Sequence, residues 1–515
     1  MHIEKVEVKN FRCVQSHVIE FDQITSFIGP NGAGKSTVLR ALNWVFNGAK
    51  DSLDFTDIFG AIPESTEVVS VTVTFGGLTD RDRIVLTPRY APTQSSSFTL
   101  RREWSISGED RLSGGSEGYP PFSDLKRIID GPADPAKAMY LVVRDEISAA
   151  GSELPIAKTK PAIKKALEDW ELANLNKLAP TFSTDTQIFG FAGQGELAKI
   201  FTFIFVDADL RASEEVEDSS KTIVGRLMSR ALDRTVAVQA YSDLAVEVAT
   251  KHDLINATHL GPLLAEISQK LSDGIGRFTV GRSIDLRPQG SQYTPAKAKV
   301  EVHVIDGALD TGLANQGHGF QRATLVACLQ VLADYSANLD AQPALFLAIE
   351  EPELFQHPNQ ARAFAAVLRR LASDERGKLQ IAYATHSPYF VDPAEFQQVR
   401  RVTRGVNGCF SATATSRDAI AECLEGVQSP TWDINSQWSR VILGDLREAL
   451  FASVVVLCEG ADDAAIIAGA SRHFDDFDVH GITATSAPGK AALFLPHAVL
   501  QALGIPVLVV FDNDS

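Results

Sequence analysis

The pattern of hydrophobic and polar residues predicts three strands and a helix at the start of the chain. Apolar and polar residues alternate over residues 3–8, and short runs rich in apolar residues follow at 18–21 and 24–28. Alternation with a period of two is typical of a strand with one buried face. Over residues 35–47 the apolar spacing becomes that of a helix, so the chain begins with strands that lead into a helix.

A β-rich stretch and a long helical stretch come next. Strands are predicted at residues 68–75, 98–100 and near 139–143, and a loop rich in Gly and Ser is predicted at 107–121. From about residue 156 to residue 278 the pattern is mostly helical. Helices therefore interrupt the first domain.

One segment of the helical stretch has a clear apolar face. Leu264, Ile267, Leu271 and Ile275 are spaced 3, 4 and 4 residues apart behind Pro262, which suits the first turn of a helix. We interpret this face first as a bundle helix packing on a neighbour, and second as a contact between subunits. The apolar repeats are too few for a long coiled-coil arm.

The second half of the chain contains short apolar strands in two groups. A helix is expected at about 320–335, and strands are expected at 299–304, 345–349, 379–383, 453–457 and 505–511. Strands that alternate with helices indicate an α/β fold. The last two strands begin a new unit, so the fold class is α/β with a second, smaller sheet at the C-terminus.

Composition and charge narrow the class of protein. The chain has 515 residues, of which 45% are hydrophobic and 22% charged. That length corresponds to roughly three to four domains, and the composition excludes a disordered chain, a collagen and a small disulfide scaffold. The 48 basic and 65 acidic residues give a formal net charge of −17. Such a chain is not a general nucleic-acid-coating protein, although local sites can still bind phosphate.

Cysteine usage and hydropathy indicate a cytoplasmic location. The five cysteines are scattered, without a C-x-x-C pair, which argues against a zinc site or a disulfide framework and fits a reducing compartment. No segment reaches the roughly 18 consecutive apolar residues of a membrane span. We therefore expect a cytoplasmic protein with no membrane partner.

Residues 29–36 match the pattern G-x-x-x-x-G-K-[ST] between an apolar strand and a helix. Glycines in such a loop let backbone N–H groups turn toward phosphate oxygens, and the following helix points its positive end at them. Lys35 is expected to reach the β- and γ-phosphates, and Ser36 to place its hydroxyl on Mg²⁺. A glycine-rich structural turn is the alternative, which the strand–loop–helix context disfavours. The predicted phosphate site comprises Gly29, Asn31, Gly32, Gly34, Lys35, Ser36 and Thr37.

Two later strands end in polar residues that would complete a nucleotide site. One apolar strand runs into Glu350 and Glu351, and the strand after it is followed by His386. Adjacent carboxylates at a strand end can hold Mg²⁺ and an attacking water beside a γ-phosphate. We assign Glu350 to the metal, Glu351 to the water and His386 to the γ-phosphate. Either feature alone is more typical of a solvated strand end or a hydrogen-bonded histidine, but their order behind the phosphate loop favours the catalytic interpretation.

Two segments are candidates for an element that closes this site from a partner subunit. Residues 112–116 resemble the signature of transporter ATPases, but no helix is predicted after them and they lie far upstream of the acidic strand, so we interpret them as a loop. Residues 315–322 open a predicted helix shortly before that strand. Gly317, Gly319 and Gln321 are therefore the candidate contacts to another subunit's γ-phosphate.

The C-terminal unit carries a second group of carboxylates. Glu459 and Asp463 follow one apolar strand, and Asp512 and Asp514 follow another. Carboxylates at two strand ends can converge on a divalent metal that holds a scissile phosphate. E-G and D-N-D are also frequent turn sequences, so each half alone is a weak signal. Their occurrence together and in order favours a metal site.

The first group of motifs resembles an ABC-type ATPase head of the kind found in RecF and in the OLD (overcoming lysogenisation defect) proteins. The resemblance rests on residues 8–12, 29–36, 316–322, 349–353, 357–358 and 385–388. It implies ATP bound between two heads, hence a homodimer or higher homo-oligomer, and it adds Arg12 to the nucleotide contacts. Glu350 stands where many relatives carry Asp, and it remains a competent Mg²⁺ ligand.

The second group resembles the TOPRIM domain shared by primases, topoisomerases and OLD-family nucleases. The resemblance implies that Glu459 is the metal-binding or general acid–base glutamate and that Asp463 is the second acid of E-G-x-x-D. Asp512 and Asp514 become metal ligands, and Gly489 matches a turn of the family. Mg²⁺ is the expected ion, with Mn²⁺ or Ca²⁺ as alternatives at this site.

An ABC head followed by TOPRIM is the OLD arrangement, and the resemblance covers essentially the whole chain. It implies an ATPase head at 1–155 and 279–402, a helical dimerisation insert at 156–278, a connecting region at 403–450 and a partial TOPRIM domain at 451–515. OLD TOPRIM domains continue with further acids and a lysine that do not follow Asp514 here. We therefore expect the printed chain to be a fragment of a longer protein, the alternative being an incomplete nuclease site.

The resemblance implies an ATP-binding and ATP-hydrolysing, Mg²⁺-dependent DNA endonuclease of the OLD type, in which the ATP state gates cleavage during anti-phage defence. DNA and a second copy of the chain are the expected partners, and a helicase or effector is a further candidate partner. One alternative is a RecF-like repair or clamp ATPase with an inert TOPRIM unit. Another is an ATPase sensor that recruits an effector. The clustered carboxylates favour the first interpretation, because an inert unit does not need them.

Overall fold

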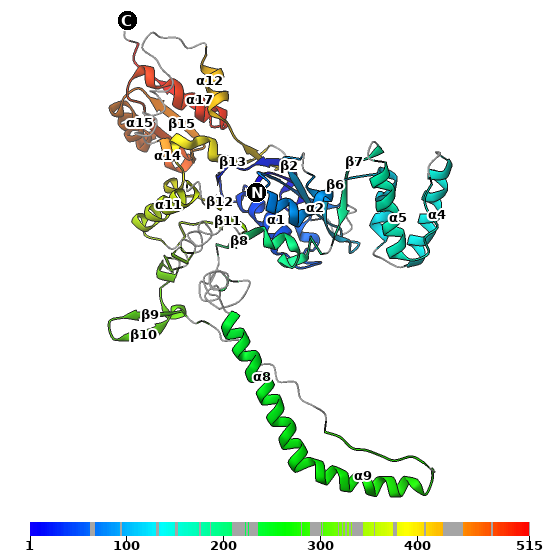
Figure 1. The fold of residues 1–515 in the computed structure, drawn as a ribbon. Helices are drawn as coiled ribbons and strands as arrows, with labels where there is room; N and C mark the ends of the chain where they lie inside the picture. The colour runs from blue at the N-terminus through cyan, green and yellow to red at the C-terminus, as the bar shows by residue number, and fades with distance from the viewer. Residues whose placement is uncertain are drawn as a thin grey trace. The chain divides into compact units, whose positions relative to one another are not determined.

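The structure of the protein is a computed structural model. It describes residues 1–513 except 62–66, 93–94, 130–132, 150–152, 175–176, 186, 209–221, 223–224, 226–234, 280, 289–299, 301, 318, 322, 325–326, 329–330, 332–342, 355, 374–378, 406–407, 426–445 and 475–476. The chain divides into two compact units (Figure 1), one comprising Met1–Leu210 with Ala333–Ser515 and the other Arg211–Leu332.

The first unit contains an antiparallel sheet of six strands in the order β2-β1-β4-β5-β6-β7. Its strands are β1 (His2–Phe11), β2 (Val14–Glu20), β4 (Val69–Gly76), β5 (Phe98–Trp104), β6 (Asp110–Gly118) and β7 (Ala179–Thr184). On one face of β1, Ile3, Val6 and Val8 are fully buried. The alternation predicted for the start of the chain is confirmed at Val6 and Val8, which are buried, while Lys5 and Lys9 beside them are exposed.

A second sheet has the order β14-β13-β3-β12-β11-β8. Its strands are β3 (Ile24–Ile28), β8 (Phe201–Val206), β11 (Ala344–Glu350), β12 (Leu379–Ala384), β13 (Val399–Arg404) and β14 (Phe410–Thr413). All neighbours pair in parallel except β14, which is antiparallel to β13. The apolar strands β3, β11 and β12 are buried along their whole length, as expected where a parallel sheet is covered on both faces.

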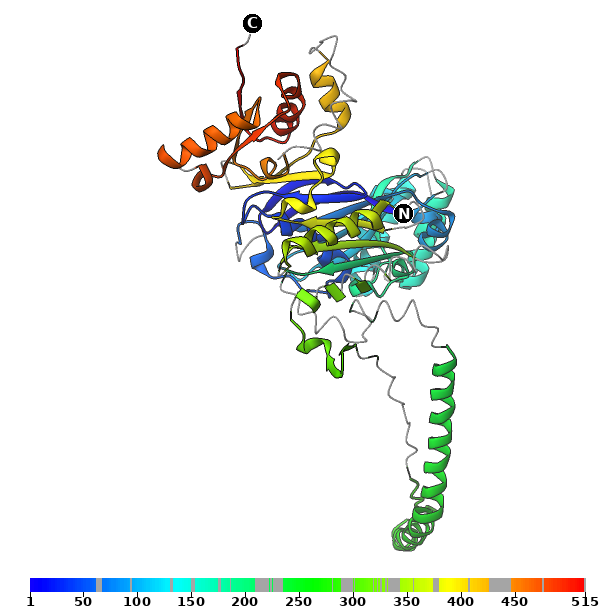
Figure 2. The same cartoon turned by 90° about the vertical axis from the view of Figure 1, so that its left-hand side faces the viewer.

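Helix α1 (Lys35–Asn47) follows the phosphate loop and packs against strands of both sheets. Val38, Leu42 and Val45 on this helix belong to the core that the two sheets share, and Phe46 stacks on Phe203 of β8 with ring centroids 5.1 Å apart. Helix α11 (Pro358–Ser373) packs on β12 and covers the outer side of the second sheet (Figure 2). This layering fixes the start of α1 beside the C-terminal ends of β11 and β12.

Helices α2 (Asp80–Tyr90), α3 (Ser123–Ile128), α4 (Ala133–Ala149) and α5 (Lys160–Ala173) lie beside the antiparallel sheet or at its end. The strand predicted near 139–143 is wrong, because these residues lie within α4. Tyr140, Val143 and Ile147 are all buried in one small core with α3 and α5. Their spacing of 3 and 4 is that of a helix face.

The predicted loop at 107–121 is also wrong, because most of it forms β6, and residues 112–116 are therefore strand. Gly114 and Gly115 are required there by crowding: a Cβ on Gly114 would collide with the ring of Phe189, and one on Gly115 with the hydroxyl of Thr99. Glycine marks a close approach of a neighbouring side chain in this strand.

The predicted helical stretch at 156–278 contains two strands that the sequence pattern missed. β7 pairs with β6, and β8 pairs in parallel with β11, where Ile204 lies opposite Leu347. β8 was missed because its apolar run is short, and period alone does not separate such a run from a buried helix segment. It is the edge strand of the second sheet.

The C-terminal part of the first unit has a parallel sheet in the order β16-β15-β17. Its elements are β15 (Val454–Cys458), α15 (Ala461–Phe474), α16 (Phe477–His480), β16 (Ile482–Ser486), α17 (Phe494–Ala502) and β17 (Val507–Val510). Helices α12 (Arg417–Leu424) and α14 (Leu446–Ala449) precede it. β15 and β17 confirm the strands predicted for this unit. The core beneath α17 also includes Ile28 of β3, Val399 of β13 and the nearby Phe396.

The second unit contains the hairpin β9 (His303–Asp306) and β10 (Leu309–Gly312), and helices α8 (Thr235–Ile255) and α9 (Gly261–Gly276) joined by a π-helical turn (Figure 1). α9 confirms the helix predicted behind Pro262. Ile267 and Leu271 on its apolar face are 47% and 42% exposed. The helix predicted at 320–335 lies largely outside the described residues. Among the described helices, none has the length and apolar character needed to cross a membrane.

Candidate functional site

The phosphate loop connects β3 to α1 in a conformation that needs glycine. Gly29, Gly32 and Gly34 have φ angles of 140°, 71° and 108°, and Gly34 directly precedes the first residue of α1. Residues with a Cβ rarely adopt these angles. At Gly34 a Cβ would also collide with the thiol of Cys13. The glycine pattern is therefore explained both by backbone conformation and by close packing.

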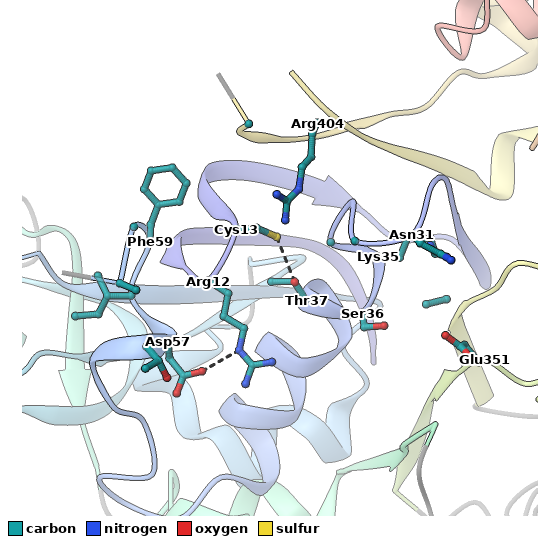
Figure 3. Close-up of a pocket in the computed structure, with 18 of the residues that line it drawn as sticks. Arg12, Cys13, Asn31, Lys35, Ser36, Thr37, Asp57, Phe59, Glu351 and Arg404 are labelled. Carbon is teal, nitrogen blue, oxygen red and sulfur yellow. Dashed lines mark hydrogen bonds and ion pairs between the residues drawn. The ribbon is translucent and has the colours of Figure 1, made fainter. Parts of the chain in front are cut away.

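The loop lines a pocket of about 900 Å³ (Figure 3), which lies within the size range of small-molecule and cofactor sites. Nine of the predicted site residues line it, namely Arg12, Asn31, Gly32, Gly34, Lys35, Ser36, Thr37, Glu351 and His386. The pocket thus brings together segments that are more than 350 residues apart in the sequence. Of the predicted phosphate residues, Gly29 is not part of the lining; it lies against Val402 of β13.

Lys35 is held in the pocket by the loop itself. Its Nζ donates hydrogen bonds to the carbonyl oxygens of Gly29 and Pro30, both at 3.0 Å. Burial lowers the pKa of Lys35 to about 8, although the carboxylates of Glu351 and Glu353 act in the opposite direction. The positive charge of Lys35 is therefore only partly balanced by nearby carboxylates, which suits the lysine to binding an anionic ligand.

Glu350 ends β11 as a buried carboxylate. Its side chain is 2% exposed, and its Oε2 accepts a 2.7 Å hydrogen bond from Nη2 of Arg40, which also bonds Asp207 at 3.0 Å. Burial raises the pKa of Glu350, and Arg40 opposes this shift. Its other oxygen, Oε1, has no hydrogen-bond partner among the described residues. A buried oxygen without a partner fits the assignment of Glu350, together with the hydroxyl of Ser36, to Mg²⁺.

Glu351 leaves the strand direction and enters the pocket. Its φ of 44° lies in the left-handed region, and its backbone N–H donates a 2.8 Å hydrogen bond to the carbonyl of Ala384 on β12. Figure 3 shows its carboxylate facing the loop near Ser36. Backbone strain of this kind occurs where a functional side chain must be aimed. The geometry suits the predicted role beside an attacking water.

His386 is positioned by Glu353, which sequence reasoning left without a role. One oxygen of Glu353 accepts a 2.6 Å hydrogen bond from the backbone N–H of His386, and the other accepts a 2.8 Å bond from the hydroxyl of Thr385. Burial raises the pKa of Glu353. Burial and the charge of Lys35 lower the pKa of His386, so its imidazole is mainly neutral at pH 7. The sequence feature that could have identified Glu353 is an acidic residue three positions after Glu350.

The opposite end of the pocket contains the predicted Arg12 together with residues that the motifs did not identify. Arg12 forms an ion pair with Asp57 at 2.8 Å, and the lining continues through Thr56, Ile58, Phe59, Gly60 and Ala61. Cys13 lies 3.3 Å from the hydroxyl of Thr37, measured from its Sγ. Arg404, at the end of β13, reaches the pocket from another side (Figure 3).

The segment predicted to close a partner's site lies in the second unit. Gln321 is 5% exposed and donates hydrogen bonds to the carbonyls of Ala314 and Gln316, so its side chain stabilises its own turn. Among the described residues, no atom lies within 4 Å of a Cβ built on Gly317, while Gly319 begins the helical residues that follow. Their approach to another subunit's nucleotide stays a prediction.

The C-terminal carboxylates lie at one edge of the small parallel sheet. Glu459 follows β15 and Asp512 follows β17, and the backbone N–H of Asp512 donates a 3.2 Å hydrogen bond to Oε2 of Glu459. Lys490, which we did not predict, donates a 2.6 Å hydrogen bond to the carbonyl of Asp512. Gly489 donates its N–H to the carbonyl of Glu459 at 3.1 Å.

Asp463 in the first turn of α15 is the third described acid of this group. Its Oδ2 lies 3.1 Å from the position of a Cβ on Gly460, so the carboxylate lies over the turn that follows Glu459. Asp514 lies outside the described residues. Within the described ranges, no three acidic, His or Cys side chains are close enough to form a metal cluster. The donor set, carboxylate oxygens at two adjacent strand ends, nevertheless has the chemistry that Mg²⁺ prefers.

Two family models match the chain in the order that the sequence motifs indicated. The AAA ATPase domain matches residues 1–185 and 156–391, which is well over half of the chain. The chain belongs to the AAA ATPase domain family. The TOPRIM domain of proteins like the overcoming lysogenization defect protein matches residues 450–514. The α/β fold class, a P-loop ATPase followed by a TOPRIM domain, is thereby confirmed.

Two nucleases are similar to the chain over its full length. The OLD nuclease of Thermus scotoductus (strain ATCC 700910 / SA-01) is 23% identical over an alignment of 529 residues, which covers 99% of this chain and 82% of the relative. The Old nuclease of Escherichia phage P2 is 21% identical over 544 residues, covering 100% and 77%. The chain therefore combines an AAA ATPase domain with an OLD-like TOPRIM domain, which are the domains of an ATPase and a nuclease. Domains of these two kinds generally use ATP and divalent metals.

Solved structures of SMC head domains are distantly similar. An SMC head bound to the C-winged helix domain of ScpA has a TM-score of 0.40 and 13% identity, covering 81% of this chain and 99% of that chain. The SMC head domain from Thermotoga maritima has a TM-score of 0.34 and 14% identity, covering 81% and 100%.

Proposed function

We propose that the protein is an ATP-binding and ATP-hydrolysing, Mg²⁺-dependent DNA endonuclease of the OLD type, in which the ATP state gates cleavage and which acts in the cytoplasm in anti-phage defence. One observation carries the proposal: Lys35, Glu351 and His386 meet in one pocket, while Glu459 and Asp512 meet at the edge of a TOPRIM sheet in the same compact unit. A protein with only one of these activities does not need both sites.

In the ATP site each residue has a role in ATP binding or hydrolysis that follows from its position. Lys35 and the backbone N–H groups at the start of α1 bind the phosphates. Ser36 and the Glu350 oxygen that has no hydrogen-bond partner among the described residues would hold Mg²⁺, which would neutralise charge on the phosphates. Glu351 accepts a hydrogen bond from the attacking water and orients it. His386, held by Glu353, contacts the γ-phosphate.

In the TOPRIM site the carboxylates of Glu459, Asp463, Asp512 and Asp514 would hold a divalent metal, which would attract DNA phosphate to an otherwise acidic chain. Bound metal supplies charge neutralisation at the scissile phosphate. Mn²⁺ or Ca²⁺ can occupy the same oxygen ligands. The net charge of −17 is consistent with a DNA-cleaving protein, because some of the acidic residues that produce it would serve as metal ligands.

Homodimerisation is part of the proposal. The apolar faces of α8 and α9 supply a surface for a second copy, since Val238, Leu244, Leu263 and Ile267 are 59%, 45%, 58% and 47% exposed. Apolar residues exposed in a row along a helix commonly mark an interface. Gly317, Gly319 and Gln321 would then act on the partner's nucleotide, with a helicase or effector as a further partner.

A supercoiled-plasmid assay with the full-length natural protein, Mg²⁺ or Mn²⁺ and ATP tests the nuclease. We expect Glu459→Ala to lose nicking while ATP hydrolysis stays intact, and Glu351→Gln to lose ATP turnover by about a hundredfold or more. Glu425→Ala, a surface change outside both sites, is the matched control. Full nicking by Glu459→Ala would refute the TOPRIM assignment. Wild-type ATP turnover in Glu351→Gln would refute the ATP site.

A further inference from the structure

Strand β13 and the start of β14 lie directly against the phosphate loop. A Cβ on Gly29 would collide with the carbonyl oxygen of Val402 in β13, and a Cβ on Gly34 would lie 3.0 Å from the ring of Phe410 in β14. Phe410 also donates its N–H to the carbonyl of Cys13 at 3.3 Å. The two strands therefore touch the first and the last glycine of the loop.

The same strand holds the TOPRIM domain. Arg401 donates a 2.9 Å hydrogen bond from Nη1 to the carbonyl of Gly504 and a 3.4 Å bond from Nη2 to that of Ala452. Val399 lies in the core that contains Leu500 and Leu503. β13 thus contacts the phosphate loop through its backbone and the TOPRIM domain through its side chains.

The last residue of β13 carries a cation into the nucleotide pocket. Arg404 lines the pocket and is exposed, and Figure 3 shows its guanidinium extending toward Cys13. Among the described residues, no carboxylate forms an ion pair with it. By contrast Arg12 is paired with Asp57, and Lys35 already donates to two loop carbonyls. Arg404 is therefore the lining arginine whose donors remain available for a ligand.

We propose that Arg404 is a nucleotide-binding residue that contacts the phosphates nearest the nucleoside, and that β13 transmits nucleotide occupancy to the TOPRIM domain through Arg401. Figure 3 shows the guanidinium near Cys13, whose Sγ lies 3.3 Å from the hydroxyl of Thr37, and shows Glu351 at the far side of the phosphate loop, which places the guanidinium away from the γ-phosphate end. Guanidinium groups bind phosphate oxygens through paired donors. The ligand class is a nucleoside di- or triphosphate. This inference rests on the ATP site proposed above and adds the residue that connects it to the second domain.

The first test measures ATP and ADP affinity by isothermal titration calorimetry in the full-length protein. Arg404→Ala should weaken both nucleotides by roughly tenfold, because a charged hydrogen bond to phosphate is lost at a partly solvated site. Arg404→Lys should restore part of the affinity. Arg144→Ala, which removes a partly exposed arginine of α4 outside the pocket, is the matched control and should bind both nucleotides like the wild type. Because Arg404 is exposed, the variant should melt at the wild-type temperature.

Unchanged affinity in Arg404→Ala would overturn the assignment, and a loss confined to ATP would overturn its placement near the nucleoside. If the wild type itself bound no ATP, the proposed function would fail instead, so the two failures are distinguishable.

The second test uses Arg401→Ala. This variant should bind ATP with wild-type affinity. The change in its plasmid-nicking rate when ATP is added should be at most half of the change in the wild type. A full ATP response in that variant would overturn the role of β13.

Discussion

The carboxylate of Glu353 holds the backbone of His386 at 2.6 Å, measured from Oε1 to the amide nitrogen. Its second oxygen holds the hydroxyl of Thr385 at 2.8 Å. Both bonds join the turn after β11 to the turn after β12, so one partly buried side chain links the two strand ends that supply Glu351 and His386. Glu353 itself does not line the pocket. It acts on the nucleotide site only through the residues that it positions.

Replacing Glu353 with Gln should slow ATP turnover without removing ATP binding. The amide keeps the shape but has one acceptor oxygen, so one of the two N–H or O–H donors loses its partner and the turn carrying His386 shifts. We expect kcat to fall by about tenfold to a hundredfold with ATP affinity within about threefold of the wild type. Steady-state hydrolysis and calorimetry measure both. Glu395→Gln, which changes a surface acid paired with Arg417, should leave both values unchanged, and equal kcat in the two variants would contradict the positioning role.

Nucleotide affinity should fall as the pH rises above 8, because burial lowers the pKa of Lys35 to about 8. Below this pH the lysine is already protonated, so binding takes up no proton and affinity is flat. Above it, phosphate binds the ammonium form and raises the pKa again, so each complex takes up a proton and affinity falls by up to about tenfold per pH unit. Titrations between pH 6.5 and 9.5 check this. In Lys35→Arg the guanidinium stays charged, so the slope should vanish; a slope equal to the wild type there would assign it to another group.

Substitution of Arg102, which binds the C-terminal end of α1, should lower the stability of the protein. This arginine is fully buried, pairs with Asp110 at 2.7 Å, and donates to the carbonyls of Trp44, Gly48 and Ala49 at the C-terminus of α1. Arg102→Met leaves the carboxylate of Asp110 buried and unpaired, so the free energy of unfolding should drop by about 3–5 kcal/mol.

Urea denaturation measures this loss, and the neighbouring residue supplies the control. Arg101 lies on the same strand, with its side chain 28% exposed, and Arg101→Met should cost less than about 1 kcal/mol. The double change Arg102→Met with Asp110→Leu should recover part of the loss, because no unpaired charge remains. Equal destabilisation by Arg101→Met and Arg102→Met would contradict the account.

The sequence predicted those parts of the site whose chemistry is local. The loop at residues 29–36 carries its own glycine spacing, and the acids after β11 and β15 follow apolar strands directly, so pattern alone located them. It missed β8, whose short apolar run is buried by pairing with a strand more than 100 residues later. It also missed Arg404 and Lys490, which look like ordinary surface cations until the fold brings them beside distant residues. Contacts of this kind depend on tertiary structure, which neither period nor composition encodes.

Lys490 should matter for DNA cleavage because it fixes the segment that carries Asp512. Its Nζ donates a 2.6 Å hydrogen bond to the Asp512 carbonyl and lies 5.0 Å from the centre of the Phe511 ring, while Asp512 bonds Glu459 through its backbone. Without the ammonium, the carboxylates of Glu459 and Asp512 are held together less firmly. Lys490→Ala should therefore raise the Mg²⁺ concentration needed for half-maximal plasmid nicking by about tenfold, within the range for residues that orient metal ligands. Lys490→Arg should stay close to the wild type and ATP hydrolysis should be unaffected in both; an unchanged Mg²⁺ requirement in Lys490→Ala would show that the segment is fixed by other contacts.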